Sequence, residues 1–209
     1  YPKDSRKQMR VLSRDEQTQF ALYLSENADS CKFGVLLMLF TGLRIGELCA
    51  LKWSDIDINE KIISVKTTMQ RLQNADSDSA QKTRIIIGLP KSDTSLRKIP
   101  ITDYISDLCR RFESENGQAY VLTGTEYFME PRTLQYRIKI YTEECGLKGV
   151  HAHTFRHTFA TRAVEAGFEI KSLSEVLGHA NTTITLDRYV HSSMEQKRIN
   201  MDKLSALAI

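Results

Sequence analysis

The residues of this sequence that could do chemistry are concentrated in one stretch, residues 151–191. It holds all five histidines, an arginine among them, Arg156, and a tyrosine near its end, Tyr189. Imidazole and guanidinium groups without a carboxylate cluster suit a bound anion, and a tyrosine hydroxyl offers a nucleophile beside it. We therefore expect the rest of the chain to bring two more cations, Arg44 and Lys91, to this stretch.

The first residues of this stretch allow two kinds of site. His153 and Arg156 are three residues apart at the start of an expected helix, so they share a face near the positive end of the helix dipole and can hold an anion. Zinc binding by His153 and His157 is the rival interpretation. It is disfavoured because the H-x-x-x-H spacing lacks the glutamate of the protease pattern and Arg156 would repel a cation. We interpret His157 as a packing or helix-surface histidine.

Composition limits the class of protein. A chain of 209 residues with 41% hydrophobic content can bury one good core and one small subdomain. A net charge of +3 permits nucleic-acid binding but does not indicate it. No apolar run approaches the ~20 residues of a membrane span, and we expect no signal peptide. The four cysteines are scattered, which indicates reduced thiols in a cytosolic protein. The abrupt start without methionine is typical of a domain cut from a longer polypeptide.

The periodicity predicts a mostly α-helical fold with one small antiparallel β-sheet, an α+β class. Ser13 and Glu16 form a capping-box pattern for the first helix, and Gly42 should end a buried second helix. The expected helices are 14–27, 31–41, 45–51, 102–116, 131–146, 153–166, 171–177, 182–189 and one from Met194; the expected strands are 55–58, 61–66, 83–87 and one within 91–101, with a polar loop at 73–81.

Several motifs in order resemble the catalytic domain of the tyrosine recombinases, the phage-type integrases. The family's H-x-x-R-H-T-F-A-T box stands at residues 153–161, and L-G-H stands at 177–179, followed by the tyrosine run 185–191. The T-G-x-R-x-x-E-L box stands at residues 41–48, and S-x-R-x-I-P stands at 95–100. The match covers essentially the whole chain, and among relatives it looks most like integrases of conjugative transposons.

The resemblance implies metal-free, cofactor-free cleavage and rejoining of DNA. Arg44 and Arg156 would hold the non-bridging oxygens of one phosphodiester, and His179 would add a further donor. Tyr189 would attack the phosphorus and become a 3′-phosphotyrosine. His153 would act as its base or as a donor to the phosphate.

Two more residues complete the expected site. Lys91 is the candidate general acid for the departing 5′-oxygen. It follows Pro90, where the family usually has threonine, so Lys82 and Lys98 stay open as alternatives. Glu47, one helical turn after Arg44, should orient that arginine and not bind a metal.

The resemblance also implies an organisation and partners. We expect a basic linker at 1–11, a catalytic domain at 12–193 and a C-terminal helix at 194–209 exchanged between protomers. The expected function is site-specific recombination that excises and integrates a mobile element in the bacterial cytoplasm, on the nucleoid. Its partners would be double-stranded DNA, a homotetramer on two duplexes and an accessory excision factor. The alternatives are DNA relaxation like that of a type IB topoisomerase, and a catalytically silent DNA-binding module.

Overall fold

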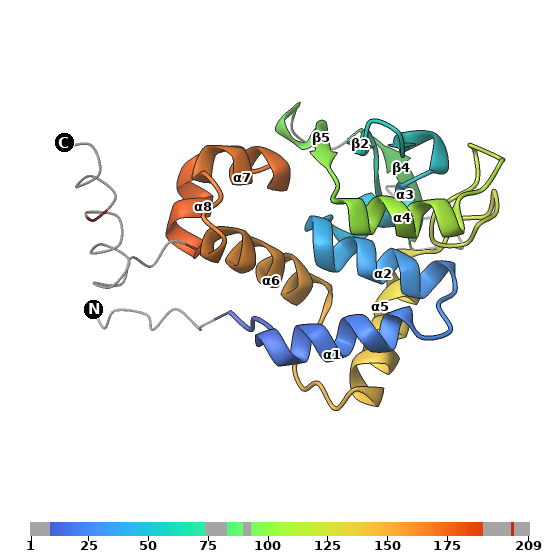
Figure 1. Ribbon diagram of the computed structural model, residues 1–209. Coiled ribbons are helices and arrows are strands. Elements are labelled where there is room, and N and C mark those ends of the chain that lie inside the picture. Colours follow the sequence, from blue (N-terminus) through green and yellow to red (C-terminus); the bar gives the residue numbers. More distant parts are fainter. Residues whose placement is uncertain (1–8, 74–82, 90–92, 190–201, 203–209) are drawn as a thin grey trace.

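The protein is described by a computed structural model that covers residues 9–73, 83–89, 93–189 and 202. It is mostly helical, with a three-stranded and a two-stranded antiparallel sheet (Figure 1). This confirms the predicted fold class. The helices are α1 (Arg14–Ser25), α2 (Ser30–Thr41), α3 (Ile45–Ala50), α4 (Asp103–Phe112), α5 (Pro131–Glu144), α6 (Ala152–Glu165), α7 (Ile170–Leu177) and α8 (Thr182–Tyr189). The strands are β1 (Ile56–Asp57), β2 (Ile62–Val65), β3 (Thr68–Gln73), β4 (Thr83–Gly88) and β5 (Arg97–Pro100), with 3-10 turns η1 (Trp53–Asp55) and η2 (Asp93–Ser95).

Helix α2 lies at the centre of the main core. Its sequence, S-C-K-F-G-V-L-L-M-L-F-T, is apolar on every face, and α1, α4 and α6 pack around it. The Asp29 side chain caps its first turn, and Gly42 ends it with a φ of 68°, a left-handed conformation that glycine adopts without strain. The predicted buried helix and its stop at Gly42 are both confirmed. The turn after Gly42 carries Arg44.

A second, smaller apolar cluster lies between α6, α7 and α8. It is formed by Ala160, Ala163, Leu173, Leu177 and Tyr189, all buried. These three helices form one side of the molecule (Figure 1), and α7 also contacts β5. The tyrosine is therefore packed against the helix that carries the H-x-x-R-H motif.

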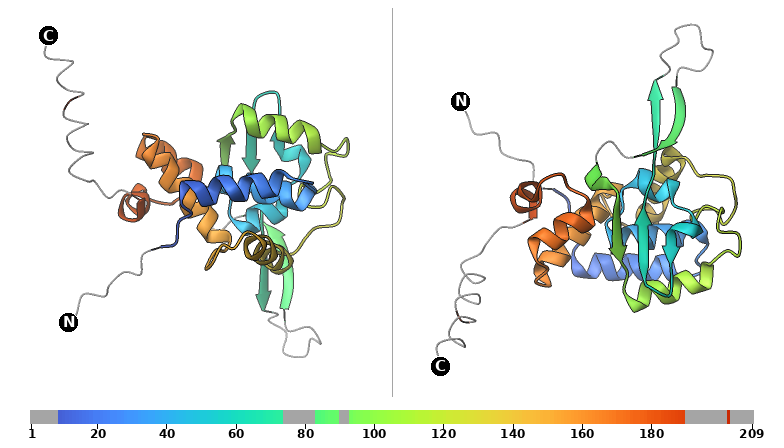
Figure 2. Two further views of the ribbon diagram at one scale, coloured as in Figure 1. Left: turned by 60° about the horizontal axis from the view of Figure 1, so that its bottom comes forward. Right: turned by 90° about the horizontal axis from the view of Figure 1, so that it is seen from above.

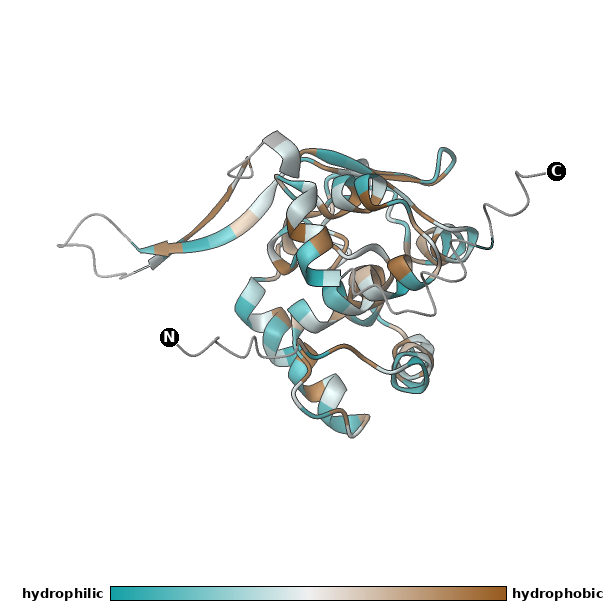
Figure 3. Cartoon of the chain, turned by 90° about the vertical axis from the view of Figure 1, so that its left-hand side faces the viewer, coloured by the Kyte–Doolittle hydropathy of each residue, from teal (hydrophilic) through white to brown (hydrophobic). Residues whose placement is uncertain are grey.

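The prediction of a single sheet was wrong. Strands β1, β2 and β5 form one sheet, in which Ile63 pairs with Ile99. Strands β3 and β4 form a separate ribbon, in which Met69 pairs with Ile87. Figure 2 shows this ribbon projecting from the body, and Figure 3 shows polar and apolar residues interspersed along it. Strand β3 was missed because in T-M-Q-R-L-Q only Met69 is buried, so the sequence lacks the alternation of a half-buried strand.

Several predictions fall outside the described residues. These are most of the linker at 1–11, the polar loop at 73–81 except Gln73, which instead ends β3, then Lys91, His191 and, apart from Asp202, the C-terminal helix at 194–209. Within the described part, the four cysteines are free thiols, and no helix is long and apolar enough to cross a membrane.

Gly46 provides a test of how α3 is docked on the ribbon. A Cβ added to Gly46 would lie 2.5 Å from the Met69 carbonyl oxygen, which is backbone and cannot rotate away. We expect Gly46→Ala to lower the free energy of unfolding by about 1–3 kcal/mol, the usual cost of overpacking, in urea denaturation.

Gly88→Ala, on strand β4 of the ribbon, is the matched control. Its added Cβ would meet its nearest neighbour, a side-chain atom of Ile86, at 3.9 Å, an ordinary contact. Equal losses of stability in the two variants would contradict the proposed docking contact.

Candidate functional site

Arg44 lies in the turn between α2 and α3, where it is the N-cap residue of α3. Its Nη1 donates to Glu47 Oε1 at 2.7 Å, and its Nη2 donates to the carbonyl oxygen of Gly178 at 2.9 Å. Its side chain stays 33% exposed. The guanidinium of Arg44 is thus held by two hydrogen bonds, and the side chain is still accessible to a ligand.

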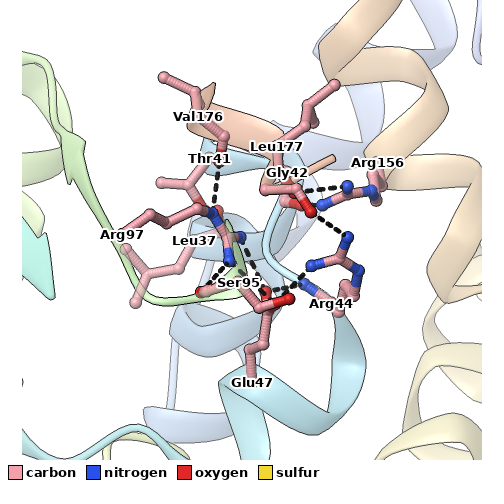
Figure 4. A network of polar contacts seen from close by, with 11 residues as sticks. Leu37, Thr41, Gly42, Arg44, Glu47, Ser95, Arg97, Arg156, Val176 and Leu177 are labelled. Carbon is pink, nitrogen blue, oxygen red and sulfur yellow. Dashed lines mark hydrogen bonds and ion pairs between the residues drawn. The ribbon is translucent and has the colours of Figure 1, made fainter. Parts of the chain in front are cut away.

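Glu47 is the buried carboxylate of the site, and Arg97 of β5 holds it from the other side. Nη1 and Nη2 of Arg97 donate to the two carboxylate oxygens of Glu47, each at 2.9 Å, while Nε donates to the Val176 carbonyl at 2.6 Å (Figure 4). Burial alone would raise the pKa of Glu47, but hydrogen bonds and charge from Arg97, with the charge of Arg44, hold this pKa below its ordinary value. Glu47 therefore stays ionised and orients both arginines.

Arg156 projects from α6 and is only 5% exposed. Its Nη1 donates to the Gly42 carbonyl at 2.8 Å and its Nη2 to the Leu177 carbonyl at 2.6 Å (Figure 4). Both acceptors are at helix C-termini, where carbonyl groups lack helical partners and favour a cation. Burial, with repulsion from Arg44, lowers the pKa of Arg156 to about 9. The guanidinium is charged at neutral pH, and the two carbonyl groups that bind it do not neutralise this charge.

Arg44 and Arg156 therefore converge on the end of α7, since their acceptors, Gly178 and Leu177, are adjacent residues. Among Arg44, Arg97, Arg156 and Glu47, three positive charges face one negative charge. Partly buried cations in surplus favour the binding of an anion.

His179 follows Gly178, the left-handed residue that ends α7 with a φ of 64°. Its Nδ1 lies 2.8 Å from the hydroxyl oxygen of Thr185 on α8. Burial, together with the charges of Arg156 and Arg44, lowers the pKa of His179 to about 3, so the ring is neutral at physiological pH. A neutral imidazole fixed at Nδ1 leaves its Nε2 to contact a ligand.

Tyr189 ends α8 and is 8% exposed. Its hydroxyl lies 2.7 Å from Nδ1 of His157 on α6. Burial raises the pKa of Tyr189, and the charges of Arg156 and Arg188 oppose this rise. The phenol is thus protonated in the protein alone and lies beside cations.

His153 lies one helical turn before His157 and is exposed at the surface of α6. Its ring centroid is 6.5 Å from that of His157 and 6.3 Å from that of His151. Partial burial and the neighbouring His151 lower the pKa of His153. His153 lies at the open face of the site. The histidine that contacts the tyrosine hydroxyl is His157, one helical turn later.

Of the three lysine candidates for the general acid, the structure describes one, Lys98. Lys91 and Lys82 lie beyond the described residues, whereas Lys98 lies on β5. Successive side chains on a strand point to opposite faces, so Lys98 is turned away from the face on which Arg97 meets Glu47. Its side chain is exposed.

Sequence reasoning missed two residues of the site. Arg97 was quoted within S-x-R-x-I-P without a role, although an arginine two residues before an isoleucine in an expected strand shares a face with it, which is a signal for a buried ion pair. His157 was assigned to packing, yet it contacts the tyrosine. In the described part of the chain, no group of three or more His, Cys, Asp or Glu residues could hold a metal ion.

The Arg97–Glu47 pair should dominate the stability of this site. We expect Arg97→Met to lower the free energy of unfolding by about 3–5 kcal/mol in urea denaturation, because it leaves a buried carboxylate short of its main partner. Lys139→Met removes an exposed pair with Glu143, 3.7 Å apart, and should cost less than about 1 kcal/mol. Comparable losses in the two variants would contradict this account.

The neutral ring of His179 predicts a pH dependence of stability. The unfolded histidine takes up a proton near pH 6.5, whereas the folded one stays neutral down to about 3. Stability should therefore fall as the pH decreases below about 6.5, and His179→Gln should make this fall shallower in urea unfolding measured at a series of pH values. An unchanged pH dependence in the variant would contradict the depressed pKa. The charged groups that face the ring are Arg156, Arg44, Arg188 and Arg97.

Comparison with known proteins identifies relatives across nearly the whole chain. The sequence profile of the phage integrase family matches residues 10–196. The XerC-like tyrosine recombinase of Caldanaerobacter subterraneus subsp. tengcongensis is 29% identical over 190 residues, covering 83% of this chain and 49% of that protein. The ICEBs1 integrase of Bacillus subtilis is 24% identical over 215 residues, covering 97% of this chain and 56% of that protein. The chain thus spans about half the length of these curated relatives.

Solved structures agree with this relationship. The Tn1549 transposon integrase in complex with a circular intermediate DNA is 25% identical, with a TM-score of 0.75 over 96% of this chain and 68% of that chain. The XerA recombinase, 23% identical, shares the fold with a TM-score of 0.65 over 93% of this chain and 65% of that chain. The expected similarity to transposon integrases is confirmed. With its family profile matched from residue 10 to residue 196, this chain belongs to the phage integrase family, the tyrosine recombinases.

Proposed function

We propose that this chain is the catalytic domain of a site-specific DNA recombinase that excises and integrates a mobile element. The observation that carries the proposal is the pair of guanidiniums, Arg44 and Arg156, fixed at the end of α7 beside the buried phenol of Tyr189. A phosphodiester supplies the anion that these cations lack and the electrophile that the phenol needs.

The proposed reaction is an in-line displacement at phosphorus. Tyr189 Oη bonds to the phosphorus, the bond from phosphorus to the 5′-oxygen breaks, and a 3′-phosphotyrosine remains. Arg44 and Arg156 neutralise the charge that builds on the non-bridging oxygens, with His179 as a further donor. A new 5′-hydroxyl then attacks the phosphotyrosine and releases the tyrosine, so strands are rejoined without ATP.

The other groups would serve proton transfer and positioning. Lys91 is proposed to protonate the leaving 5′-oxygen, with Lys82 as the alternative, and the orientation of Lys98 away from Arg97 argues against Lys98. His153, at the open face of the site, is proposed as a base or as a donor to the phosphate. Glu47 orients Arg44 through its carboxylate. Neither a metal nor a cofactor is needed, because the cations that stabilise the phosphate come from side chains.

The proposed partner is double-stranded DNA, in keeping with the Tn1549 integrase solved with a circular intermediate DNA. Four copies would assemble on two duplexes, with residues 194–209 of each docked on a neighbour and an accessory factor directing excision. Residues 1–11 would cross the DNA backbone, and residues 12–193 would form the catalytic domain. The place of action would be the nucleoid of a bacterial cytoplasm.

Covalent capture of DNA tests the proposal. A pool of synthetic nicked duplexes of randomised sequence is incubated with the protein, and adducts that survive SDS are recovered and sequenced. Cleavage frees the short strand between the scissile phosphate and the nick, which carries the new 5′-hydroxyl. This strand diffuses away, so the phosphotyrosine accumulates. We expect the wild type to form an adduct with EDTA present and Tyr189→Phe to form none, because phenylalanine lacks the nucleophilic oxygen.

Tyr136→Phe is the matched control, because Tyr136 is 64% exposed on α5, and it should form as much adduct as the wild type. DNA binding without an adduct in the wild type would favour the silent binding module and contradict the proposal. Relaxation of supercoiled plasmid by the wild type, with no exchange of strands between duplexes, would favour the topoisomerase alternative.

A further inference from the structure

The hydroxyl group of Tyr189 meets the edge of a histidine ring. Its oxygen lies 2.7 Å from Nδ1 of His157, and the two ring centroids are 5.8 Å apart with their planes at 47°. The contact is therefore made by the hydroxyl group and not by stacked faces. It joins the last residue of α8 to the middle of α6.

The phenolic hydrogen needs an acceptor, and the neighbouring charges cannot provide one. The charged groups acting on Tyr189 are guanidiniums, those of Arg156, Arg188 and Arg44. A guanidinium only donates hydrogen bonds, whereas a neutral imidazole has one nitrogen that accepts. Among these neighbours, the nitrogen of His157 is the group that can receive the phenolic hydrogen.

The surroundings of His157 keep its ring neutral. Burial is the largest cause, followed by the charges of His153 and Arg188, and together with weaker effects they lower the pKa of His157 to about 4. At physiological pH the ring therefore keeps an available lone pair. An entering phosphate would offset the nearby positive charge and make a protonated His157 less costly.

From this contact, and resting on the proposed function, we propose that His157 accepts the proton of Tyr189 when the tyrosine attacks DNA. The O–H bond of the phenol breaks and an N–H bond forms at Nδ1 of His157, while Oη bonds to phosphorus. The bond to the 5′-oxygen breaks, and that oxygen takes its proton from the separate general acid of the proposed function. On rejoining, the imidazolium returns its proton to the departing tyrosine oxygen.

This assignment separates the two histidines of the H-x-x-R-H motif. His153, exposed and one turn away on α6, is left to contact the phosphate. His157, half-buried, serves the nucleophile. The role of general base, expected for His153, is thus assigned to His157, four residues later on the same helix face.

Single-turnover cleavage of a captured duplex tests the proposal with the wild type, His157→Asn and His157→Phe. Asparagine keeps a polar atom near the position of Nδ1 but takes no proton, and phenylalanine keeps only the ring. We expect both variants to cleave about 100-fold more slowly than the wild type at saturating protein, the lower range for loss of a general base. Thermal melts and DNA binding would verify that both variants fold and bind.

Two further measurements isolate the proton transfer. The ratio of the wild-type rate to each variant rate should fall as the pH rises, because hydroxide then removes the proton. A 3,5-difluorotyrosine at position 189, a more acidic phenol, should reduce the defect of both variants. The titratable and charged groups that face His157 are His151, His153 and Arg156 from α6 and its cap, and Arg188 and Tyr189 from α8.

A duplex with a bridging 5′-sulfur locates the proton, because a thiolate leaves without protonation. The defect of the His157 variants should persist on this duplex, and a restored rate would place His157 at the leaving group and overturn the proposal. Cleavage by either His157→Asn or His157→Phe at the wild-type rate, or faster, would also overturn it. Absence of any adduct with the wild type would instead contradict the proposed function itself.

Discussion

The carboxylate of Glu47 is the interaction on which the site depends. It is buried, and two guanidiniums reach it from different parts of the chain, Arg97 from β5 and Arg44 from the turn after α2. The same arginines also bond the carbonyls of Val176 and Gly178 at the end of α7. One ionised oxygen pair thereby fixes the three-stranded sheet, the central helix and the small helical cluster relative to one another. A lysine or an alanine in place of Arg97 could not bridge both partners, because only the planar guanidinium fork donates in several directions at once.

The helix ends explain how cations can be concentrated without being fully paired. Arg156 is held by the carbonyl groups at the ends of α2 and α7, which carry partial negative charge but cannot cancel a full positive one. Nearby, His179 and His157 remain neutral, which avoids further repulsion. The result is a positive and partly desolvated surface whose arginines are already held by hydrogen bonds in the protein alone. Such preorganisation is the main source of catalytic power in phosphoryl transfer.

Local features of the sequence predicted much of this structure. The capping box at Ser13, the stop at Gly42 and the apolar run of α2 are short-range signals, and all three were read correctly. Strand β3 was not, because its partner β4 lies farther along the chain and its burial depends on contact with α3. The contacts of Arg97 and His157 were missed for the same reason: their partners are 50 and 32 residues away along the chain. Motifs indicated which residue types gather, whereas the contacts between them arise only when the helices pack.

The central claim is that side chains far apart in sequence meet around one phosphorus atom. The most direct measurement is a crystal structure of the Tyr189→Phe variant bound to a duplex that the wild type has been shown to cleave. The account predicts that Arg44 and Arg156 both contact non-bridging oxygens of the same phosphate, with the ring at position 189 opposite the 5′-oxygen. Arginines bound to two different phosphates, or a scissile phosphate that neither arginine reaches, would contradict it.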